Sequence, residues 1–218
     1  MSMMKLADKQ RVILASGSPR RKELLEGLGL TFEIMVTNTD ESLVPGESAI
    51  HMVQRLALRK AWAIGDKERS AWTIGADTTV VIDGEILGKP ETEADAVAML
   101  SKLSGATHEV IGAFCVINPA RAVEVCEVHR TKVTMMLLDA KTIQRYVRTG
   151  EPMDKAGAYG IQTAPFRPVC GLRGCFASVM GLPLGDLRDL LASFGVMVAP
   201  AVPPICRGYG AKECCADG

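Results

Sequence analysis

Residues 12–25 constrain the fold of this chain more than any other stretch. Four apolar residues lead into a small-residue loop at 16–18, after which leucines recur at helical spacing. Ser18 can cap this helix, and Pro19 fits its first position, where a missing N–H costs nothing. A second apolar run follows at 31–36. The order strand, helix, strand predicts a parallel pair of strands, which is typical of an α/β fold.

The first turn of the predicted helix is unusually basic. Arg20, Arg21 and Lys22 lie where the helix dipole favours acidic side chains, so they are unfavourable unless an anion joins them. The loop before the helix is already suited to anions, because its backbone N–H groups are unpaired. We therefore predict that this turn, with Ser16 and Ser18 of the loop, binds a polyanion, most simply a chain of phosphates. The alternative is a solvated basic turn without a ligand.

Composition limits the partners of the chain. Lys and Arg number 25, as do Asp and Glu, so the formal net charge is zero and we expect no general binding to nucleic acid or membranes. The hydrophobic fraction of 48% is that of an ordinary globular protein. No apolar run reaches the ~18 residues of a spanning helix. Residues 1–11 also lack the apolar core of a signal peptide, so we expect a cytoplasmic protein.

The cysteines and the chain ends predict the domain organisation. Seven cysteines, Cys115 and Cys126 among them, form no paired CxxC motifs, and we expect reduced thiols. The prolines and cysteines of 200–218 predict a weakly ordered tail. We therefore expect an N-terminal extension at 1–10, one domain at 11–199 and the tail.

Periodicity and turn residues predict the remaining elements. Helices are expected at 47–63, 92–103, 139–150 and 184–194. Strands are expected at 72–82, 85–87, 107–118, 122–137 and 176–180, of which the two longest would form an antiparallel hairpin.

Two charged residues fall at positions that should be buried. Lys60 lies three residues after Ala57 and four after Leu56, so it belongs to the inward stripe of its helix. There it either meets an acid or a polar cleft, or snorkels at the edge of the stripe. Asp77 interrupts an apolar strand and needs cations, a metal or hydrogen-bond donors. The alternative for Asp77 is a structural aspartate with satisfied hydrogen bonds.

One ligand would explain all of these charges. Acids on separate elements accompany several cations near loops or cleft-facing positions: Glu41, Asp77, Arg20, Arg21, Lys60 and Lys89. Mg²⁺ prefers one or two carboxylates, several waters and substrate phosphates. Phosphoryl or nucleotidyl transfer depends mainly on charge neutralisation. The pattern therefore points to a metal-bound polyphosphate, with Glu41 and Asp77 as metal ligands.

Eight short blocks of sequence occur in order between residues 11 and 194. They are LASGSPRRKELL at 14–25, DE at 40–41, RKA at 59–61, GADT at 75–78, GKP at 88–90, LSG at 103–105, DKAGAYGIQ at 154–162 and VMGLPL at 179–184. In these blocks the chain resembles the Maf family, the Maf-like nucleoside triphosphate pyrophosphatases. The segment at 163–173 and the cysteine-rich tail depart from the family pattern.

The resemblance implies a fold and an activity. The fold is a long twisted mixed β-sheet flanked by helices, with two lobes around a central cleft, related to the inosine triphosphate pyrophosphatases. The activity is hydrolysis of a nucleoside triphosphate to the monophosphate and pyrophosphate, with Mg²⁺ or Mn²⁺. We expect Glu41, Asp77, Lys60 and Lys89 to be catalytic. The block that ends at Gln162 resembles the subfamily acting on dTTP and UTP, including modified uridine triphosphates.

Lys155 and Gln162 are the predicted contacts to the base. A glutamine amide offers a donor and an acceptor, so it can pair with the N3–H and an adjacent carbonyl of uracil or thymine. The alternative is that Gln162 only ties a loop to the sheet. For the whole chain the alternative is a non-catalytic nucleotide-binding regulator linked to septum formation or cell division. The partner is a nucleoside triphosphate in both cases, and a homodimer is left open.

Overall fold

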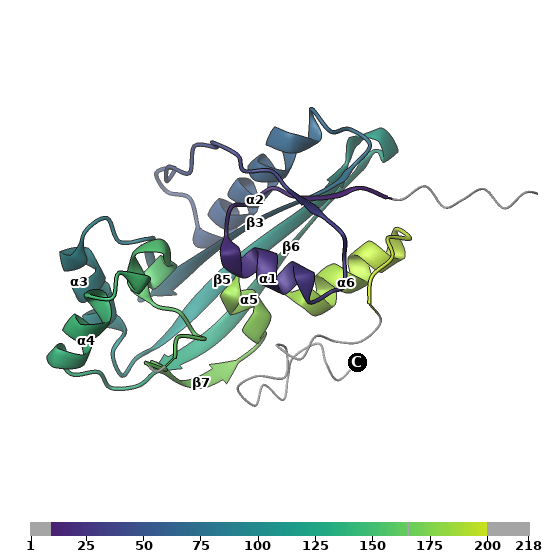
Figure 1. The fold of residues 1–218 in the computed structure, drawn as a ribbon. Coiled ribbons are helices and arrows are strands. Elements are labelled where there is room, and N and C mark those ends of the chain that lie inside the picture. Colours follow the sequence, from purple (N-terminus) through teal and green to yellow (C-terminus); the bar gives the residue numbers. More distant parts are fainter. Residues whose placement is uncertain (1–9, 165, 200–218) are drawn as a thin grey trace, which may run out of the picture.

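The computed structural model describes residues 10–164 and 166–199. The predicted extension, apart from residue 10, and the predicted tail lie outside these residues. A long twisted sheet crosses the molecule, and helices cover both of its faces (Figure 1). No helix in the described ranges is long and apolar enough to cross a membrane.

Within residues 10–164 and 166–199 the sheet has seven strands and is mixed. Its order is β2-β1-β3-β5-β6-β7, with β4 paired to β3, and β1 runs parallel to β2 and β3 whereas the other pairs are antiparallel. The strands are β1 (Val12–Leu14), β2 (Glu33–Ile34), β3 (Trp72–Ile82), β4 (Glu85–Leu87), β5 (Thr107–Asn118), β6 (Val123–Met135) and β7 (Val169–Arg173). The predicted βαβ unit and the long hairpin are confirmed.

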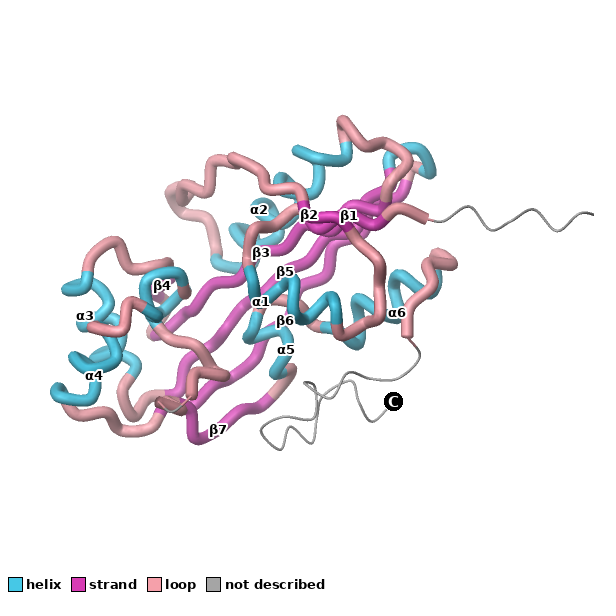
Figure 2. Tube along the Cα trace, viewed as in Figure 1, coloured by secondary structure: helices cyan, strands magenta, loops and turns pink. Residues whose placement is uncertain are grey.

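The described part of the chain forms six α-helices. The tube view shows how they lie around the sheet (Figure 2). They are α1 (Pro19–Glu26), α2 (Ala49–Gly65), α3 (Glu93–Leu103), α4 (Ala140–Val147), α5 (Phe176–Met180) and α6 (Leu184–Ser193). Four of them begin after capping side chains, namely the predicted cap Ser18 and Ser48, Thr92 and Asp139. Each cap accepts a hydrogen bond from a backbone N–H of the first turn, which is how such residues start a helix.

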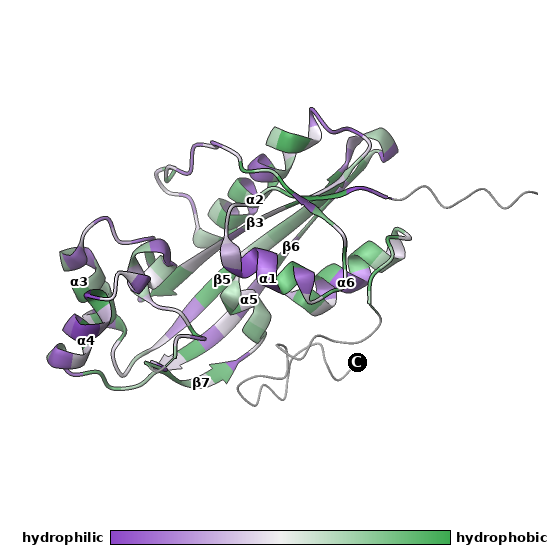
Figure 3. Ribbon diagram, in the orientation of Figure 1, coloured by the Kyte–Doolittle hydropathy of each residue, from purple (hydrophilic) through white to green (hydrophobic). Residues whose placement is uncertain are grey.

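Successive side chains of β5 point to opposite faces of the sheet and belong to two separate hydrophobic cores. Ile111, Ala113, Cys115 and Ile117 pack under α2. Val110, Phe114 and Val116 face the opposite side, where they join the larger core with α1, α5 and α6. Most of β5 is therefore buried on both faces, which explains its nearly continuous apolar sequence. In Figure 3 the start of α1 stands out as hydrophilic against this background.

The prediction of a strand at 176–180 is wrong. These residues form α5, and the last strand is β7, which pairs with β6 through Val133 and Leu172. The Sγ of Cys175 accepts a hydrogen bond from the Ser178 N–H, and this cap begins the helix. Five apolar or small residues fit either structure, so periodicity alone could not distinguish them.

The prediction of reduced thiols is also wrong for one pair. Cys115 on β5 and Cys126 on β6 are joined by a disulfide, with 4.1 Å between their Cα atoms. The two residues stand directly opposite in the antiparallel register. Such pairs place side chains close enough for a bond, but the register depends on the fold and not on cysteine spacing.

Candidate active site

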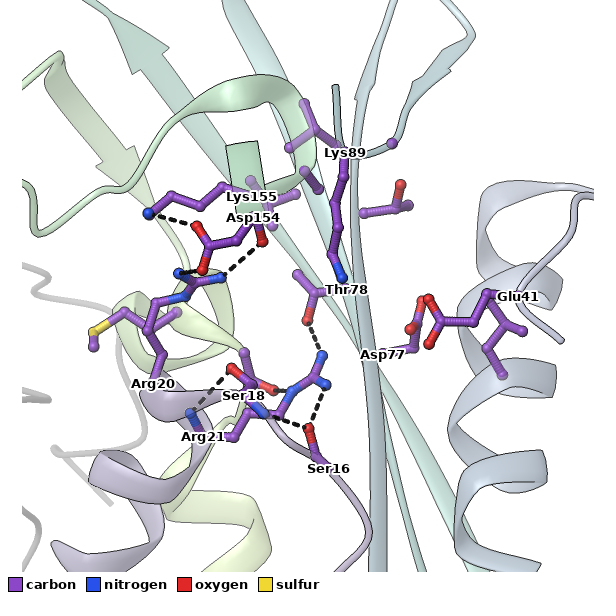
Figure 4. A pocket seen from close by; sticks show the side chains of 18 of the residues that line it. Ser16, Ser18, Arg20, Arg21, Glu41, Asp77, Thr78, Lys89, Asp154 and Lys155 are labelled. Atoms are coloured by element: carbon purple, nitrogen blue, oxygen red, sulfur yellow. Dashed lines mark hydrogen bonds and ion pairs between the residues drawn. The ribbon is translucent and has the colours of Figure 1, made fainter. Parts of the chain in front are cut away.

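A cleft of about 970 Å³ opens beside β3, where the loop after β1, the start of α1, α2 and the segment 153–162 meet. All ten predicted site residues line it: Ser16, Ser18, Arg20, Arg21, Glu41, Lys60, Asp77, Lys89, Lys155 and Gln162. Figure 4 labels eight of them, all except Lys60 and Gln162, and shows that they come from separate elements around one space. The structure thus brings together residues that are up to 146 positions apart, from Ser16 to Gln162.

Lys60 and two carboxylates form the centre of one wall. The Lys60 ammonium nitrogen lies 2.7 Å from Glu41 Oε1 and 2.7 Å from Asp77 Oδ1. Lys60 is 6% exposed and Asp77 8% exposed, so the predicted inward lysine and buried aspartate neutralise each other. Burial alone would raise the pKa of Glu41, but Lys60, with Lys89 and Arg21 nearby, outweighs it and holds this pKa below its usual value. Glu41 is therefore ionised at neutral pH.

The close approach of α2 to β3 creates this arrangement. Gly75 lies two residues before Asp77, and a Cβ at this position would be 2.1 Å from the Ala57 carbonyl oxygen. It would also be 2.6 Å from the Ala61 backbone nitrogen. Only a glycine lets the helix backbone come so near the strand, and this contact carries Lys60 to Asp77.

The donor set fits a hard divalent cation. Glu41 and Asp77 each direct one carboxylate oxygen at the Lys60 ammonium, so the two carboxylates lie close together on one wall of the cleft. Oxygen ligands of this kind suit Mg²⁺ and Mn²⁺. A second group, Glu127, His129 and Asp186, has ligand atoms within 4.8 Å of one another but does not line the cleft.

Arg21 ties three elements together under the cleft. Its guanidinium donates to Ser16 Oγ at 3.1 Å, to Thr78 Oγ1 at 3.3 Å and to the Gly181 carbonyl at 3.2 Å. Burial lowers the pKa of Arg21, and the negative charge of Asp77 counteracts this. Arg21 therefore fixes the loop at 16–18 against β3 and the end of α5.

Arg20 and Lys155 meet at Asp154, on the opposite side of the cleft (Figure 4). One carboxylate oxygen of Asp154 lies 3.1 Å from Arg20 Nη1, and the other lies 2.8 Å from Lys155 Nζ. Burial would raise the pKa of Asp154, but these two cations hold it below the usual value. The Lys155 ammonium also donates to the Glu151 carbonyl at 2.5 Å. The Lys155 ammonium is thus directed at protein acceptors in this structure.

Lys89 and Gln162 are two further polar residues that line the cleft. Lys89 points into the open space in Figure 4, and within the described ranges it makes no ion pair. Gln162 lies exposed at the edge of the same space. Both side chains are therefore able to contact a ligand without first breaking a strong internal bond.

Comparison with known proteins places the chain in a family. A family model described as "Maf-like protein" matches residues 11–194. This range contains all ten predicted site residues and nearly all of the described structure. The chain belongs to the Maf family.

Named relatives of this Maf protein align over nearly their whole length. A dTTP/UTP pyrophosphatase from Acetivibrio thermocellus is 47% identical over 195 residues, which is 86% of this chain and 97% of the relative. A dTTP/UTP pyrophosphatase from Desulforamulus reducens is 45% identical over 187 residues, 86% of this chain and 98% of the relative. Among solved structures, a dITP/XTP pyrophosphatase from Mycobacterium abscessus is 18% identical, with a TM-score of 0.38 over 58% of this chain and 74% of that chain.

Sequence reasoning missed several residues that hold the site of this Maf protein together. Asp154 is the partner of Arg20 and Thr78 is a partner of Arg21, and both lie inside the sequence blocks at 154–162 and 75–78. Tyr159 lines the cleft, and its hydroxyl oxygen lies 2.7 Å from Nε2 of the buried His108. Burial raises the pKa of Tyr159, so its hydroxyl stays protonated. No local signal links His108 to a tyrosine 51 positions away.

Proposed function

We propose that this chain hydrolyses dTTP and UTP between the α- and β-phosphates, releasing the monophosphate and pyrophosphate. The observation that carries the proposal is the Glu41–Lys60–Asp77 contact, which faces the basic first turn of α1 across one cleft. Two carboxylates opposite several cations suit a metal-bound triphosphate. The relatives named dTTP/UTP pyrophosphatase support this reading of the substrate.

Asp77 is the proposed general base. A water oxygen attacks the α-phosphorus, the bond from that phosphorus to the bridging oxygen breaks, and pyrophosphate leaves with the bond electrons. The proton of the water passes to the Asp77 carboxylate, which is positioned on the rigid strand β3. Glu41 and Asp77 would hold Mg²⁺ or Mn²⁺, which when bound neutralises charge on the phosphates.

The basic groups of the cleft bind the phosphates in this proposal. Arg20 offers a planar fork at the N-terminus of α1, and Lys89 reaches in from the turn after β4. Lys60 is placed to neutralise charge that develops beside Asp77. These groups act mainly by positioning and by electrostatic stabilisation, which dominate in this class of reaction.

Gln162 is the proposed reader of the base, with Lys155 beside it. Its exposed amide lies on the cleft wall, so it can offer a donor and an acceptor to a diketo pyrimidine. Cytosine reverses the pattern at two ring positions, and a fixed amide would therefore disfavour CTP. We expect UTP and dTTP to exceed CTP and GTP in kcat/KM by roughly tenfold or more.

A pyrophosphate-release assay with UTP, dTTP, CTP and GTP tests the proposal. The wild-type protein should prefer UTP and dTTP, and Gln162→Glu should change the ranking of the four nucleotides. Preference for CTP or GTP, or an unchanged ranking in Gln162→Glu, would refute the role of Gln162. Binding of all nucleotides without hydrolysis at any Mg²⁺ or Mn²⁺ concentration would favour the regulator instead.

A further inference from the structure

One proposed metal ligand lies on a segment without regular structure. Glu41 belongs to residues 35–48, which connect β2 to α2 and contain neither helix nor strand. Asp77, in contrast, lies within the eleven-residue strand β3. A ligand carboxylate must be held closely in place to bind a metal well, and a loop alone does not provide this. Some other contact must therefore fix the backbone at Glu41.

Two arginines of α2 hold the carbonyl groups on either side of Glu41. Arg59 Nη1 donates to the Asp40 carbonyl oxygen at 2.8 Å. Arg55 Nη2 donates to the Ser42 carbonyl oxygen at 3.2 Å. Arg55 and Arg59 are four residues apart on one helix, so their side chains lie on the same face, one turn apart. The loop is thus attached to α2 immediately before and immediately after Glu41.

The attachment is itself supported by other contacts. Glu47 holds the Arg55 guanidinium through two hydrogen bonds of 2.7 and 2.6 Å. The Ser42 backbone N–H donates to Asp40 Oδ1 at 2.9 Å, which closes a turn around Glu41. An arginine fork can serve a carboxylate and a carbonyl at once, whereas a lysine offers no such plane.

The same helix also holds the side chain of Glu41. Lys60 follows Arg59 directly and contacts Glu41 Oε1 at 2.7 Å. Three cations of α2 therefore act on one loop, two on its backbone and one on its carboxylate. Neither Arg55 nor Arg59 lines the cleft, so they do not touch the substrate there.

We propose that Arg55 and Arg59 are positioning residues, which fix the backbone at Glu41 so that its carboxylate can bind the divalent cation. This inference rests on the proposed function of the cleft. It assigns to the two arginines an effect on metal binding, not on nucleotide recognition.

The test compares Arg59→Ala with the wild-type protein. Arg59 is exposed, so its removal leaves the core of the protein intact. We expect the Mg²⁺ concentration for half-maximal activity to rise about fivefold, the effect of one lost hydrogen bond, while KM for UTP at saturating Mg²⁺ changes less than twofold. Mn²⁺ binding to the nucleotide-free protein, measured by loss of the free-ion EPR signal, should weaken by a similar factor. Arg59→Lys should restore part of the effect.

Arg130→Ala is the matched control, because Arg130 is an exposed arginine with an acidic partner, as Arg59 is. Arg130 pairs with Glu109 and contacts neither the loop nor the cleft. It should behave as wild type. Unchanged Mn²⁺ binding in Arg59→Ala, a loss of kcat without a change in Mg²⁺ dependence, or an equal effect in Arg130→Ala would each overturn the inference. If the wild-type protein hydrolyses no nucleotide, the proposed function fails, but the Mn²⁺ comparison still decides whether Arg59 positions Glu41.

Discussion

At the residue scale, the contact between Asp77 and Lys60 leads to the sharpest prediction. Asp77→Asn keeps the shape of the side chain but removes its charge and its ability to accept a proton. We expect kcat to fall by roughly 10²-fold or more, as is usual when a general base is lost. Pyrophosphate release at saturating Mg²⁺ measures this. The control is Asp66→Asn, at an exposed aspartate just after α2, which should keep normal turnover. Near-normal turnover by Asp77→Asn would show that Asp77 is not the general base.

Arg20 permits a second prediction at this scale. Its guanidinium donates to both the carboxylate and the backbone carbonyl of Asp154, a geometry that a lysine does not reproduce. Arg20→Lys keeps the charge, yet we expect kcat/KM for UTP to fall about tenfold, the scale of a charged hydrogen bond. Lys22 is exposed and lies two residues after Arg20, so Lys22→Arg should leave kcat/KM unchanged. An unaffected Arg20→Lys variant would mean that the guanidinium of Arg20 is not needed to bind the phosphates.

At the scale of elements, the packing of α2 on β3 determines the distance between Lys60 and Asp77. Gly75→Ala places a methyl group against the backbone of α2, so the helix must move away from the strand. We expect a loss of stability of about 1–3 kcal/mol, as for overpacked cores, together with reduced kcat. Thermal unfolding and the pyrophosphate assay measure the two effects. Gly88→Ala adds a Cβ with nothing within 4 Å and should leave Tm nearly unchanged.

Elements that depend on local signals could be predicted from the sequence. Ser18 caps its helix as expected, because a cap needs only the next three residues. Features that depend on contacts between elements could not. Cys115 and Cys126 face each other through the strand register. Lys60 was placed inward by its helical position, but its shared contact with Glu41 depends on the path of an irregular loop.

At the scale of the whole molecule, buried His108 makes stability depend on pH. Burial lowers its pKa to about 4, so it is neutral in the folded protein, whereas in the unfolded chain its pKa is 6.5. Between these values the unfolded state binds more protons, and the free energy of unfolding must fall as the pH falls. We expect His108 to contribute a loss of about 2 kcal/mol between pH 7 and pH 5.

Urea unfolding at pH 7 and pH 5 tests this expectation. His108→Gln, which cannot take up a proton in this range, should show a smaller difference between the two pH values than the wild type. His51→Gln, at an exposed histidine of α2, should match the wild type. Equal pH dependence in wild type and His108→Gln would contradict the role of His108.

The charged groups that line the cleft nearly cancel. Five cationic side chains face four carboxylates, those of Glu41, Asp77, Glu91 and Asp154. A wall of this kind has little net field at a distance, so it does not speed the diffusion of a nucleotide toward the protein. We expect kcat/KM for UTP to change less than about threefold between 50 and 200 mM salt, because screening has little long-range attraction to remove. The protein would then select its substrate by short-range contacts after encounter, at a rate that ionic strength hardly affects.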